Sequence, residues 1–379
     1  MKFLVKTLHN LEPILANELK ELGAKNIRKI KRAVACEGDL KLLYQINYCA
    51  RTALRVLVPI YEFQAKGEKD LYDQIKKFDW SEYLDVHQTF AISNSVFSDL
   101  FRHSKFATLK MKDAMADQFR DKYGRRPSVD PKSPEVQFDL HGWKDRFTVS
   151  LDSSGEPLNQ RGYREQGHQA PLNEVLAAGM VQLAKWDHKQ PLLDPMCGTG
   201  TIIIEAAMLA NNMPAQYLRK QFGFRGWKNF NPMIWNKVKI EADGQMRNKA
   251  ISISGGDIDP KAVSIAKKSL RKLGLKQSIN IREVAFEKHR PGTPDGMIIT
   301  NPPYGERLGA EDDILGFYKT ISDLFKQNFS GFDAWVLSSN FEALKHLKLS
   351  PSRKIPLLNG KLECSFQEYK LYRGAKPDA

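Results

Sequence analysis

The stretch that offers the clearest chemistry is Asn301-Pro302-Pro303-Tyr304, which follows a short apolar run at 295–300. The run predicts a buried strand, and because two prolines cannot extend a sheet, the chain must turn at the strand's carboxyl edge. Ligands bind at that edge of an open α/β sheet. The Asn301 side-chain oxygen and the Pro302 carbonyl can each accept one N–H of a planar exocyclic amine, and the Tyr304 ring can stack on the base. The alternative is an ordinary turn from strand to loop.

A second candidate site is a glycine-rich loop between a short strand that ends at Asp194 and a helix expected over 202–211. The loop lacks the lysine of a phosphate-binding GxxxxGK[ST] motif, and Ile203 stands where a dinucleotide GxGxxG loop needs its third glycine. The remaining interpretation is Asp-x-x-x-Gly-x-Gly, as in S-adenosylmethionine binding, because the Asp194 carboxylate suits the cationic methionine end of this cofactor. The predicted cofactor loop consists of Pro195, Met196, Cys197, Gly198, Thr199, Gly200 and Thr201.

Acidic residues end the next predicted strand, at 251–257. An acid at this edge of the second strand typically binds both ribose hydroxyls, which makes Asp257 the first choice, with Ile258 beside it in the same cofactor site. Asp259 is instead expected to be the N-cap of a helix over 260–273, with a proline in its first position.

A further candidate binding group precedes the glycine loop. Pro171 suits the first turn of a helix that runs through 175–186, and Arg164 lies shortly before it. A helix entry presents backbone N–H groups, so this entry and Arg164 together can hold a carboxylate or a phosphate.

These motifs need a scaffold that places strand ends side by side. From 191 to 338 apolar strands alternate with helical segments, and 354–359 and 364–372 form a final strand pair. Alternating βα units of this length predict a doubly wound, Rossmann-like parallel sheet of the α/β class. The segment 211–244 interrupts the alternation with interleaved basic and aromatic residues. It either contacts RNA or the cofactor, or forms a helical insertion with a small core of its own.

The N-terminal part has the pattern of a smaller α+β region. A strand at 2–6, a helix that begins near Pro13, a strand at 27–36 and a helix from Asp39 to Tyr48 give a ferredoxin-like order. Further strands are expected at 51–61, 89–96, 136–140 and 146–151.

A basic helix at 106–123 lies within this region. It and the loop after it can grip an RNA backbone, or the cations can form a solvated surface. The cationic residues are Lys105, Lys110, Lys112, Arg125 and Arg126. The turn-rich segment Asp152–Pro157 is the best candidate for a linker to the α/β region.

The chain has 379 residues and a formal net charge of +14. The length suits two or three domains, and the charge favours a polyanionic partner such as nucleic acid or an anionic membrane, unless it serves solubility alone. No apolar run approaches the roughly 20 residues of a membrane span, and the apolar run in the first five residues is too short for the core of a signal peptide. Four scattered cysteines without CxxC spacing indicate a reduced cytosol and argue against a disulfide framework or a zinc site. We therefore expect a cytoplasmic protein without a metal.

Taken together, the motifs resemble the THUMP-domain RNA methyltransferases, and more closely the N-terminal methyltransferase half of the bacterial enzymes that make N2-methylguanosine in large-subunit (23S) ribosomal RNA. The likeness runs along the whole chain. The residues that carry it are Ser153 and Gly155, Arg161-Gly162-Tyr163-Arg164, Ala170-Pro171-Leu172, the run 193–200, Asp257-Ile258-Asp259, the run 301–307, Lys112-Asp113-Ala114 and the run 126–130.

The resemblance implies a ferredoxin-like region at 1–44, a THUMP RNA-binding domain at 45–155 and a Rossmann-like methyltransferase domain at 160–379. It implies methyl transfer from S-adenosylmethionine to the 2-amino group of a guanosine, with 301–304 as the catalytic residues. Asn301 would also lie beside the cofactor, and Arg307 would contact a phosphate of the RNA.

Two departures from the family pattern change what is expected. Some relatives are fused to a second methyltransferase that makes 7-methylguanosine, and that activity should be absent here. Many relatives hold the adenine amine with an acid after the third strand, where this chain has Ala285-Phe286, so the adenine contact stays unassigned. The alternatives are a transfer-RNA guanosine-N2 methyltransferase, an adenine-N6 methyltransferase, and a non-catalytic RNA-binding or ribosome assembly factor.

Overall fold

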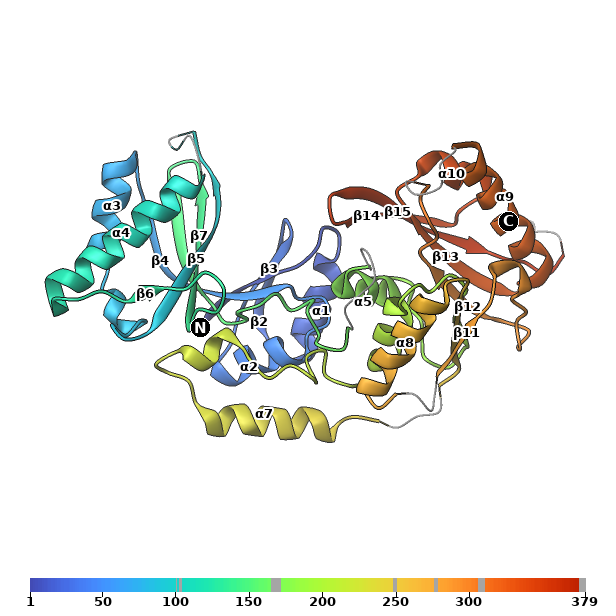
Figure 1. The fold of residues 1–379 in the computed structure, drawn as a ribbon, viewed down its shortest axis with the longest axis horizontal. Helices are drawn as coiled ribbons and strands as arrows, with labels where there is room; N and C mark the ends of the chain where they lie inside the picture. The colour runs from blue at the N-terminus through green and yellow to red at the C-terminus, as the bar shows by residue number, and fades with distance from the viewer. Residues whose placement is uncertain are drawn as a thin grey trace. The chain divides into compact units, whose positions relative to one another are not determined.

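The computed structural model describes residues 1–99, 101, 104–164, 172–247, 251–275, 279–305 and 311–374. The chain folds as two compact units (Figure 1). The first unit comprises Met1–Thr7, Ala16–Leu158 and Arg219–Glu241, and the second comprises Leu8–Leu15, Asn159–Leu218 and Ala242–Ala379. None of the described helices combines the length and apolarity that a membrane crossing requires.

The first unit is built on one eight-stranded sheet in the order β2-β3-β1-β4-β8-β7-β5-β6. Side chains alternate between its faces, so Phe3 and Val5 of β1 are buried while Lys2 is exposed. The strands are β1 (Lys2–Lys6), β2 (Lys25–Ile30), β3 (Ala33–Glu37), β4 (Arg55–Gln64), β5 (Thr89–Phe97), β6 (Ser128–Val129), β7 (Val136–Trp143) and β8 (Arg146–Asp152). The helices are α1 (Glu12–Glu21), of which the part from Ala16 onward belongs to this unit, α2 (Leu40–Cys49), α3 (Glu68–Lys77) and α4 (Ser104–Tyr123).

The prediction of one strand at 27–36 was wrong, because this stretch forms the antiparallel hairpin of β2 and β3. Ile30 pairs with Ala33, which leaves Lys31 and Arg32 as the turn. Arg32 has a φ of +60°, so the turn is made without the glycine or asparagine that usually marks it. The extra strand completes the β-α-β-β-α-β order of a ferredoxin-like unit. Asp39 stands at the start of α2 as predicted, and it is the N-cap, whose side chain accepts from the Leu42 amide at 2.8 Å.

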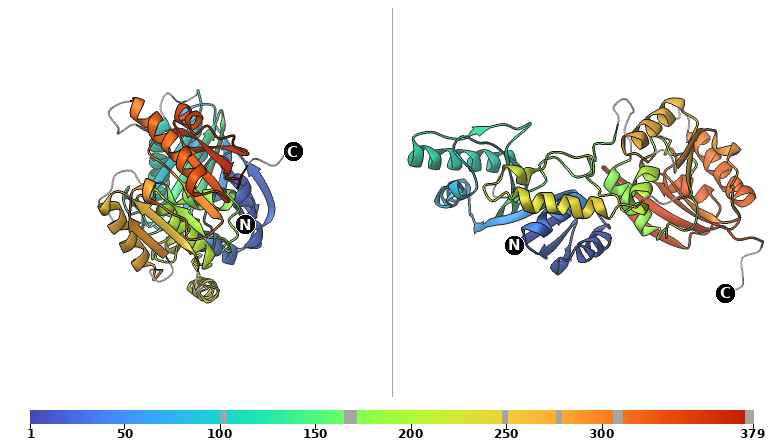
Figure 2. Two further views of the ribbon diagram at one scale, coloured as in Figure 1. Left: turned by 90° about the vertical axis from the view of Figure 1, so that its right-hand side faces the viewer. Right: turned by 90° about the horizontal axis from the view of Figure 1, so that it is seen from below.

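The insertion around α7 (Pro232–Gly244) packs into the core of the first unit and does not form a core of its own. The Trp235 ring lies 5.5 Å from that of Tyr48, and Phe224 lies 4.5 Å from Tyr44, both on α2. Figure 2 shows the yellow α7 along the blue elements of this unit. The insertion's aromatic residues are therefore explained by packing.

The expected linker Asp152–Pro157 is largely fixed in the first unit. Ser153 and Ser154 are fully buried, and the Arg219 guanidinium donates to the Ser154 and Pro157 carbonyls at 2.9 and 3.0 Å. The division between the units falls just after this segment, between Leu158 and Asn159. The predicted linker position therefore lies beside the observed division, but its turn residues are satisfied by buried hydrogen bonds within the first unit.

The second unit contains a seven-stranded sheet in the order β11-β10-β9-β12-β13-β15-β14. Its neighbouring strands are parallel except that β15 runs antiparallel to β13 and to β14. This is the predicted doubly wound α/β fold with a final strand pair. The strands are β9 (Leu192–Asp194), β10 (Ile253–Asp257), β11 (Ile279–Glu283), β12 (Gly296–Thr300), β13 (Phe332–Ser338), β14 (Arg353–Asn359) and β15 (Leu362–Lys370). The helices are α5 (Glu174–Leu183), α6 (Thr201–Ala210), α8 (Pro260–Lys272), α9 (Glu311–Asn328) and α10 (Phe341–His346).

Helix α5 begins later than Pro171, which lies outside the described residues. Asn173 is the N-cap, and its side-chain oxygen accepts from the amides of Val175 and Leu176. The expected start at Pro171 was wrong because the asparagine side chain satisfies these amides and fixes the start at Glu174.

Candidate active site

The candidate residues meet where the strand order of the second sheet reverses. β9 and β12 are adjacent and parallel, with Leu193 level with Ile298, while β10 and β11 lie on one side and β13 on the other. β9 ends at Asp194 and β12 at Thr300, so the glycine loop and the Asn301–Tyr304 turn leave the same edge of the sheet. This is the topological switch point, where open α/β sheets bind ligands.

The glycine loop is held in shape by backbone hydrogen bonds, one within the loop and one to β10. The Gly200 amide donates to the Cys197 carbonyl at 2.8 Å, and the Cys197 amide donates to the Gly256 carbonyl at 2.8 Å. Gly198 and Gly200 have φ values of +53° and +79°, which favour glycine. A Cβ on Gly200 would lie 2.9 Å from that of Ala266, whereas nothing lies within 4 Å of a Cβ on Gly198. The loop therefore leaves space beside Gly198 for a ligand to approach its backbone.

Asp194 places a carboxyl group beneath this loop with almost no exposure. Burial, the largest cause, raises the pKa of this carboxyl to about 7. The Thr300 hydroxyl and the Met196 amide, which donates to Asp194 Oδ1 at 3.3 Å, lower that pKa, and the nearby Asp257 raises it. A buried carboxylate is costly without a positive partner, so this position suits a cationic ligand group.

Asp257 ends β10 at the same edge and is partly exposed. Its two carboxylate oxygens accept from the Gly198 amide at 2.7 Å and from the Asp259 amide at 2.9 Å. Ile258, the next residue, has 74% of its surface exposed, which is unusual for a large aliphatic side chain. Asp259 is the N-cap of α8, as predicted, and accepts from the Lys261 amide. Asp257 can bind ribose hydroxyls while it fixes the glycine loop, and Ile258 offers an apolar surface for a base. The pair therefore suits a nucleoside.

The turn after β12 is held by three other elements. The Asn340 side chain donates to the Tyr304 carbonyl at 3.0 Å, and the Tyr318 hydroxyl of α9 donates to the Pro303 carbonyl at 3.3 Å. The side-chain Nδ2 of Asn359 on β14 donates to the Tyr304 hydroxyl at 3.4 Å. The sequence analysis did not predict these three hydrogen-bonding residues. The position of Asn340, just after β13 at the same edge of the sheet, could have indicated it.

The Tyr304 hydroxyl donates to Asn301 Oδ1 at 2.5 Å. Burial raises the pKa of Tyr304, so its hydroxyl stays protonated and remains a donor. The oxygen that the sequence assigned to an incoming amine is therefore already bonded in this structure. Because a carboxamide oxygen has two lone pairs, the Tyr304 hydroxyl occupies one acceptor position of Asn301 Oδ1 and leaves one for an amine N–H.

Arg164 lies at the entry to α5, where the sequence placed an anion-binding group. Its guanidinium forms an ion pair with Glu174 at 3.0 Å and donates to the Leu172 carbonyl at 2.8 Å. Burial raises the pKa of Glu174, and Arg164 lowers it. Arg164 keeps about a third of its side chain exposed. It can reach an anion only by sharing or leaving this pair.

A second buried polar cluster lies behind α6 and was not predicted as part of the site. The Tyr163 hydroxyl and the Arg161 guanidinium both bond Glu205 Oε1, at 2.9 and 3.4 Å. All three side chains are almost fully buried. The run Arg161-Gly162-Tyr163 thus anchors the chain to α6, directly after the glycine loop.

The residues predicted to bind RNA lie in the first unit, apart from Arg307, which is outside the described residues. Lys105 of α4 is exposed, and Lys110 is half-buried with its ammonium 5.2 Å from the centroid of the Phe106 ring. Lys112 pairs with Asp113 at 3.1 Å. Arg125 contacts the His87 ring nitrogen at 2.8 Å, and Arg126 is exposed. In the described parts of the chain, no group of three or more His, Cys, Asp or Glu side chains is placed to hold a metal ion.

Comparison with protein-family models gives three matches that cover most of the chain. Residues 161–368 match the RMKL-like methyltransferase domain, residues 65–152 match the THUMP domain, and residues 2–57 match the RlmL ferredoxin-like domain. The first of these contains every residue of the switch-point site described above.

Two curated proteins illustrate the sequence relatives. A protein of Synechocystis sp., provisionally named RNA methyltransferase slr0064, is 37% identical over 363 residues, covering 96% of this chain and 94% of its own length. The ribosomal RNA large subunit methyltransferase K/L of Psychromonas ingrahamii is 35% identical over 377 residues, covering 98% of this chain and 50% of its own length. The chain spans about half the length of the K/L relatives that it matches.

Solved structures share the whole architecture. SMU.472, provisionally described as a methyltransferase and solved in complex with SAH, has 25% identity and a TM-score of 0.88, with 99% of each chain covered. A protein of Listeria monocytogenes described as a "predicted N6-adenine-specific DNA methylase" has 26% identity and a TM-score of 0.87, with 97% of this chain and 95% of the other covered.

Proposed function

Since the chain belongs to the RMKL-like methyltransferases that carry a THUMP domain, we propose that it methylates the exocyclic N2 of a guanosine in large-subunit (23S) ribosomal RNA. The observation that carries the proposal is the juxtaposition at the switch point, where a glycine loop over Asp194 and the Asn301–Tyr304 turn leave adjacent parallel strands. The ribosomal target rests on the names of the K/L relatives.

The residues at the switch point fit S-adenosylmethionine. The buried Asp194 needs a positive partner, the Cβ side of Gly198 is open, and Ile258 offers an exposed apolar surface beside Asp257. When bound, this cofactor supplies an electrophilic methyl group. Asp194 would hold its ammonium group, Asp257 its ribose hydroxyls and Ile258 its adenine ring, while Arg164 would turn from Glu174 to its carboxylate. The loop residues from Pro195 to Thr201 would enclose it with backbone amides.

The turn after β12 would position the guanine. Its 2-amino group is conjugated with the ring and is a weak nucleophile, and its proton becomes acidic only as the new N–C bond forms. Asn301 Oδ1 and the Pro302 carbonyl would accept its two N–H groups, so they align the nitrogen and stabilise its developing positive charge. Rigid placement then supplies most of the rate. Pro303 keeps the turn rigid, since its φ is fixed and its carbonyl accepts from Tyr318.

The Tyr304 ring would stack on the extruded base, which offsets part of the few kcal/mol that unstacking costs. In this structure the Tyr304 hydroxyl bonds Asn301 instead. We propose that guanine binding replaces this bond, so that Asn301 receives the amine as Tyr304 moves to the base.

The remaining regions would recruit the RNA. We propose a ferredoxin-like region at 1–44, a THUMP domain at 45–155 whose α4 cations contact the backbone, and a methyltransferase domain at 160–379. Arg307 would contact a phosphate close to the base. The protein would act in the cytoplasm.

The test is methyl transfer from labelled S-adenosylmethionine to ribosomal and transfer RNA from cells that lack this gene, followed by nucleoside analysis. Label in N2-methylguanosine of large-subunit RNA is the expected result. Label in N2-methylguanosine of transfer RNA would keep the chemistry and replace the target. Label in N6-methyladenosine would show that the substrate base is adenine, the base in the name of the Listeria protein. Cofactor binding without transfer to any RNA would contradict the proposal and favour a non-catalytic assembly factor.

A further inference from the structure

The face of the eight-stranded sheet that bears Lys6 and Asp139 is hollowed into a groove of about 1390 Å³, which we call the sheet groove. All of its lining residues belong to the first unit. The alternation of side chains along β7 separates the two faces of the sheet. Asp139 and Trp143 line the groove, while Phe138 is fully buried on the other face and packs against Trp80 at 5.7 Å.

Six short side chains line the groove on three of its strands. They are Ala33 and Ala35 of β3, Ser93 and Ser95 of β5, and Thr148 and Ser150 of β8. At these positions the groove has depth for a ligand, while Lys6, Arg55 and His141 line it with longer side chains. From β1 to β5 the sheet order crosses four strand spacings, which is roughly 19 Å.

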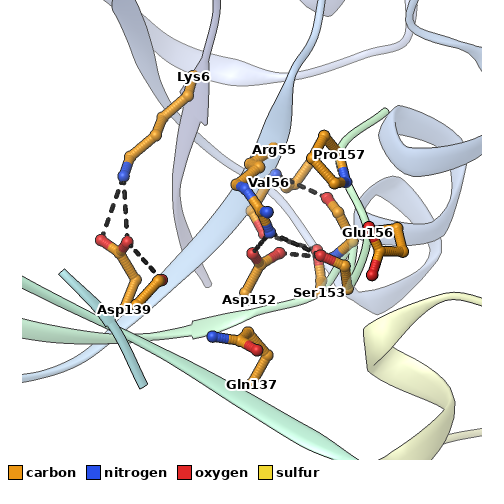
Figure 3. Close-up of polar contacts among 12 residues, drawn as sticks. Lys6, Arg55, Val56, Gln137, Asp139, Asp152, Ser153, Glu156 and Pro157 are labelled. Carbon is orange, nitrogen blue, oxygen red and sulfur yellow. Dashed lines mark hydrogen bonds and ion pairs between the residues drawn. The ribbon is translucent and has the colours of Figure 1, made fainter. Parts of the chain in front are cut away.

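One wall of the groove is positively charged. Six basic and three acidic residues line the groove, but two of the basic ones are neutralised. Lys6 lies 3.2 Å from both carboxylate oxygens of Asp139, and Arg55 is paired with the buried Asp152 (Figure 3). Of the other four, Lys2 lies on β1 and three lie on the β2–β3 hairpin. Two of these three, Arg28 and Lys31, form no ion pair within the described part of the chain.

The opposite wall carries two exposed aromatic rings. Phe97 of β5 and Trp143 of β7 are register partners, and their ring centroids lie 6.4 Å apart. They are 62% and 58% exposed, although large aromatic side chains are usually buried. Both line the groove and lie on the same face as Ser93 and Ser95.

We propose that the sheet groove binds a single-stranded segment of the RNA substrate, with its phosphates on the Arg28 and Lys31 wall and an unpaired base on Phe97 and Trp143. Basic side chains across a groove from exposed rings match a strand whose backbone is anionic and whose bases have free faces. A duplex keeps its bases paired and stacked, so it cannot use the rings. This surface differs from α4, and the proposal rests on the proposed function in that it takes RNA as the substrate.

The first measurement is fluorescence anisotropy of the full chain with an unpaired RNA oligonucleotide of about 15 nucleotides and with the same strand in a duplex. We expect the unpaired strand to bind more tightly. The double variant Phe97→Ala/Trp143→Ala should weaken binding of the unpaired strand by roughly 10- to 100-fold and change duplex binding little. The control variant Phe341→Ala, which removes an exposed ring from α10, should bind like the wild type.

The second measurement is the dependence of this affinity on salt. For single strands, each phosphate contact contributes about 0.7 to the slope of log K against log salt. Arg28→Ala/Lys31→Ala should therefore reduce the slope by up to about 1.4. The control Lys69→Ala/Lys77→Ala removes the same charge from exposed positions on α3 and should leave the slope nearly unchanged.

The outcomes separate this proposal from the function it builds on. If unpaired RNA binds the groove variants as tightly as the wild type, the groove is not its site, although the methyltransferase function would stand. If the wild type binds no RNA while it still binds S-adenosylmethionine, both proposals fail. Thermal unfolding of each variant shows whether it is folded, and Trp143→Phe, which keeps a ring, should retain most of the affinity lost in the double alanine variant.

Discussion

At the residue scale, the site combines an acid that needs a cation with an amide whose oxygen is already bonded. Asp194 is buried without the solvation that would favour its charge. Asn301, in contrast, already has a partner, because its side-chain oxygen accepts a hydrogen bond from the Tyr304 hydroxyl. Both conditions change when a cofactor and a base bind, so each gives a prediction specific to one residue.

The affinity for S-adenosylmethionine should depend on pH through Asp194. Its pKa is raised to about 7, so the carboxyl is neutral at lower pH and must lose a proton before it can hold the ammonium group. Affinity should therefore rise with pH toward about 7, by up to tenfold per pH unit. Titration calorimetry from about pH 5.5 to about pH 8 measures this. The affinity of Asp194→Asn for S-adenosylmethionine should be lower and should not change with pH over this range. If the affinity of the wild type did not depend on pH, the ammonium group would be held by another residue. The exposed Asp187→Asn serves as the control.

Asn301→Ala should lower the rate constant of a single turnover by at least about 100-fold, because the alanine cannot align or stabilise the amine. Binding of S-adenosylmethionine should be nearly intact. Rapid-quench methyl transfer and calorimetry measure the two quantities. An equal loss of both, together with a lower melting temperature, would mean that Asn301 supports the fold.

Tyr304→Phe should separate the ring from the hydroxyl. In the proposed exchange, the hydroxyl competes with the substrate amine for Asn301. Its removal should therefore leave turnover largely intact and lower KM for RNA by up to about fivefold. Tyr304→Ala should lose the stacking surface and raise KM instead. Steady-state kinetics on both variants decide this. A Phe variant as inactive as the Ala variant would show that the hydroxyl takes part in the reaction.

At the element scale, the strand-to-loop connections of the second unit were predictable because their signals are local. The glycines that need positive φ, the proline pair after β12 and the Asp259 cap of α8 all act within a few residues. The β2–β3 turn was missed because Arg32 adopts its φ without a turn residue. The packing of Trp235 on α2 and the bond between Tyr304 and Asn301 depend on contacts that no local pattern records.

The two glycines of the cofactor loop should respond differently to alanine. Gly200→Ala adds a Cβ 2.9 Å from that of Ala266 and a backbone penalty of about 1–2 kcal/mol, so it should lower the melting temperature more. Gly198→Ala carries only the backbone penalty but fills the open side of the loop, so it should weaken cofactor binding with less loss of stability. Calorimetric melting and cofactor titration check both. If Gly198→Ala lowered the melting temperature more and Gly200→Ala weakened cofactor binding more, the ligand would bind elsewhere.

At the scale of the whole molecule, the matched families divide the work between RNA capture and chemistry. The strands within the ferredoxin-like and THUMP matches belong to the first unit's sheet, and the methyltransferase match covers the switch-point site. A net charge of +14 suits a substrate much larger than the base that is modified. In the proposed function, the whole chain would select the RNA target, while the turn after β12 would select the atom that is methylated.

The central claim is tested most directly by the N2-methylguanosine content of large-subunit ribosomal RNA in cells that lack this gene. Nucleoside mass spectrometry should show a lower content than in the parent cells. Expression of the wild-type chain should restore it, and Asn301→Ala, expressed to the same level, should not. An unchanged content in the deleted cells, or full restoration by Asn301→Ala, would contradict the account.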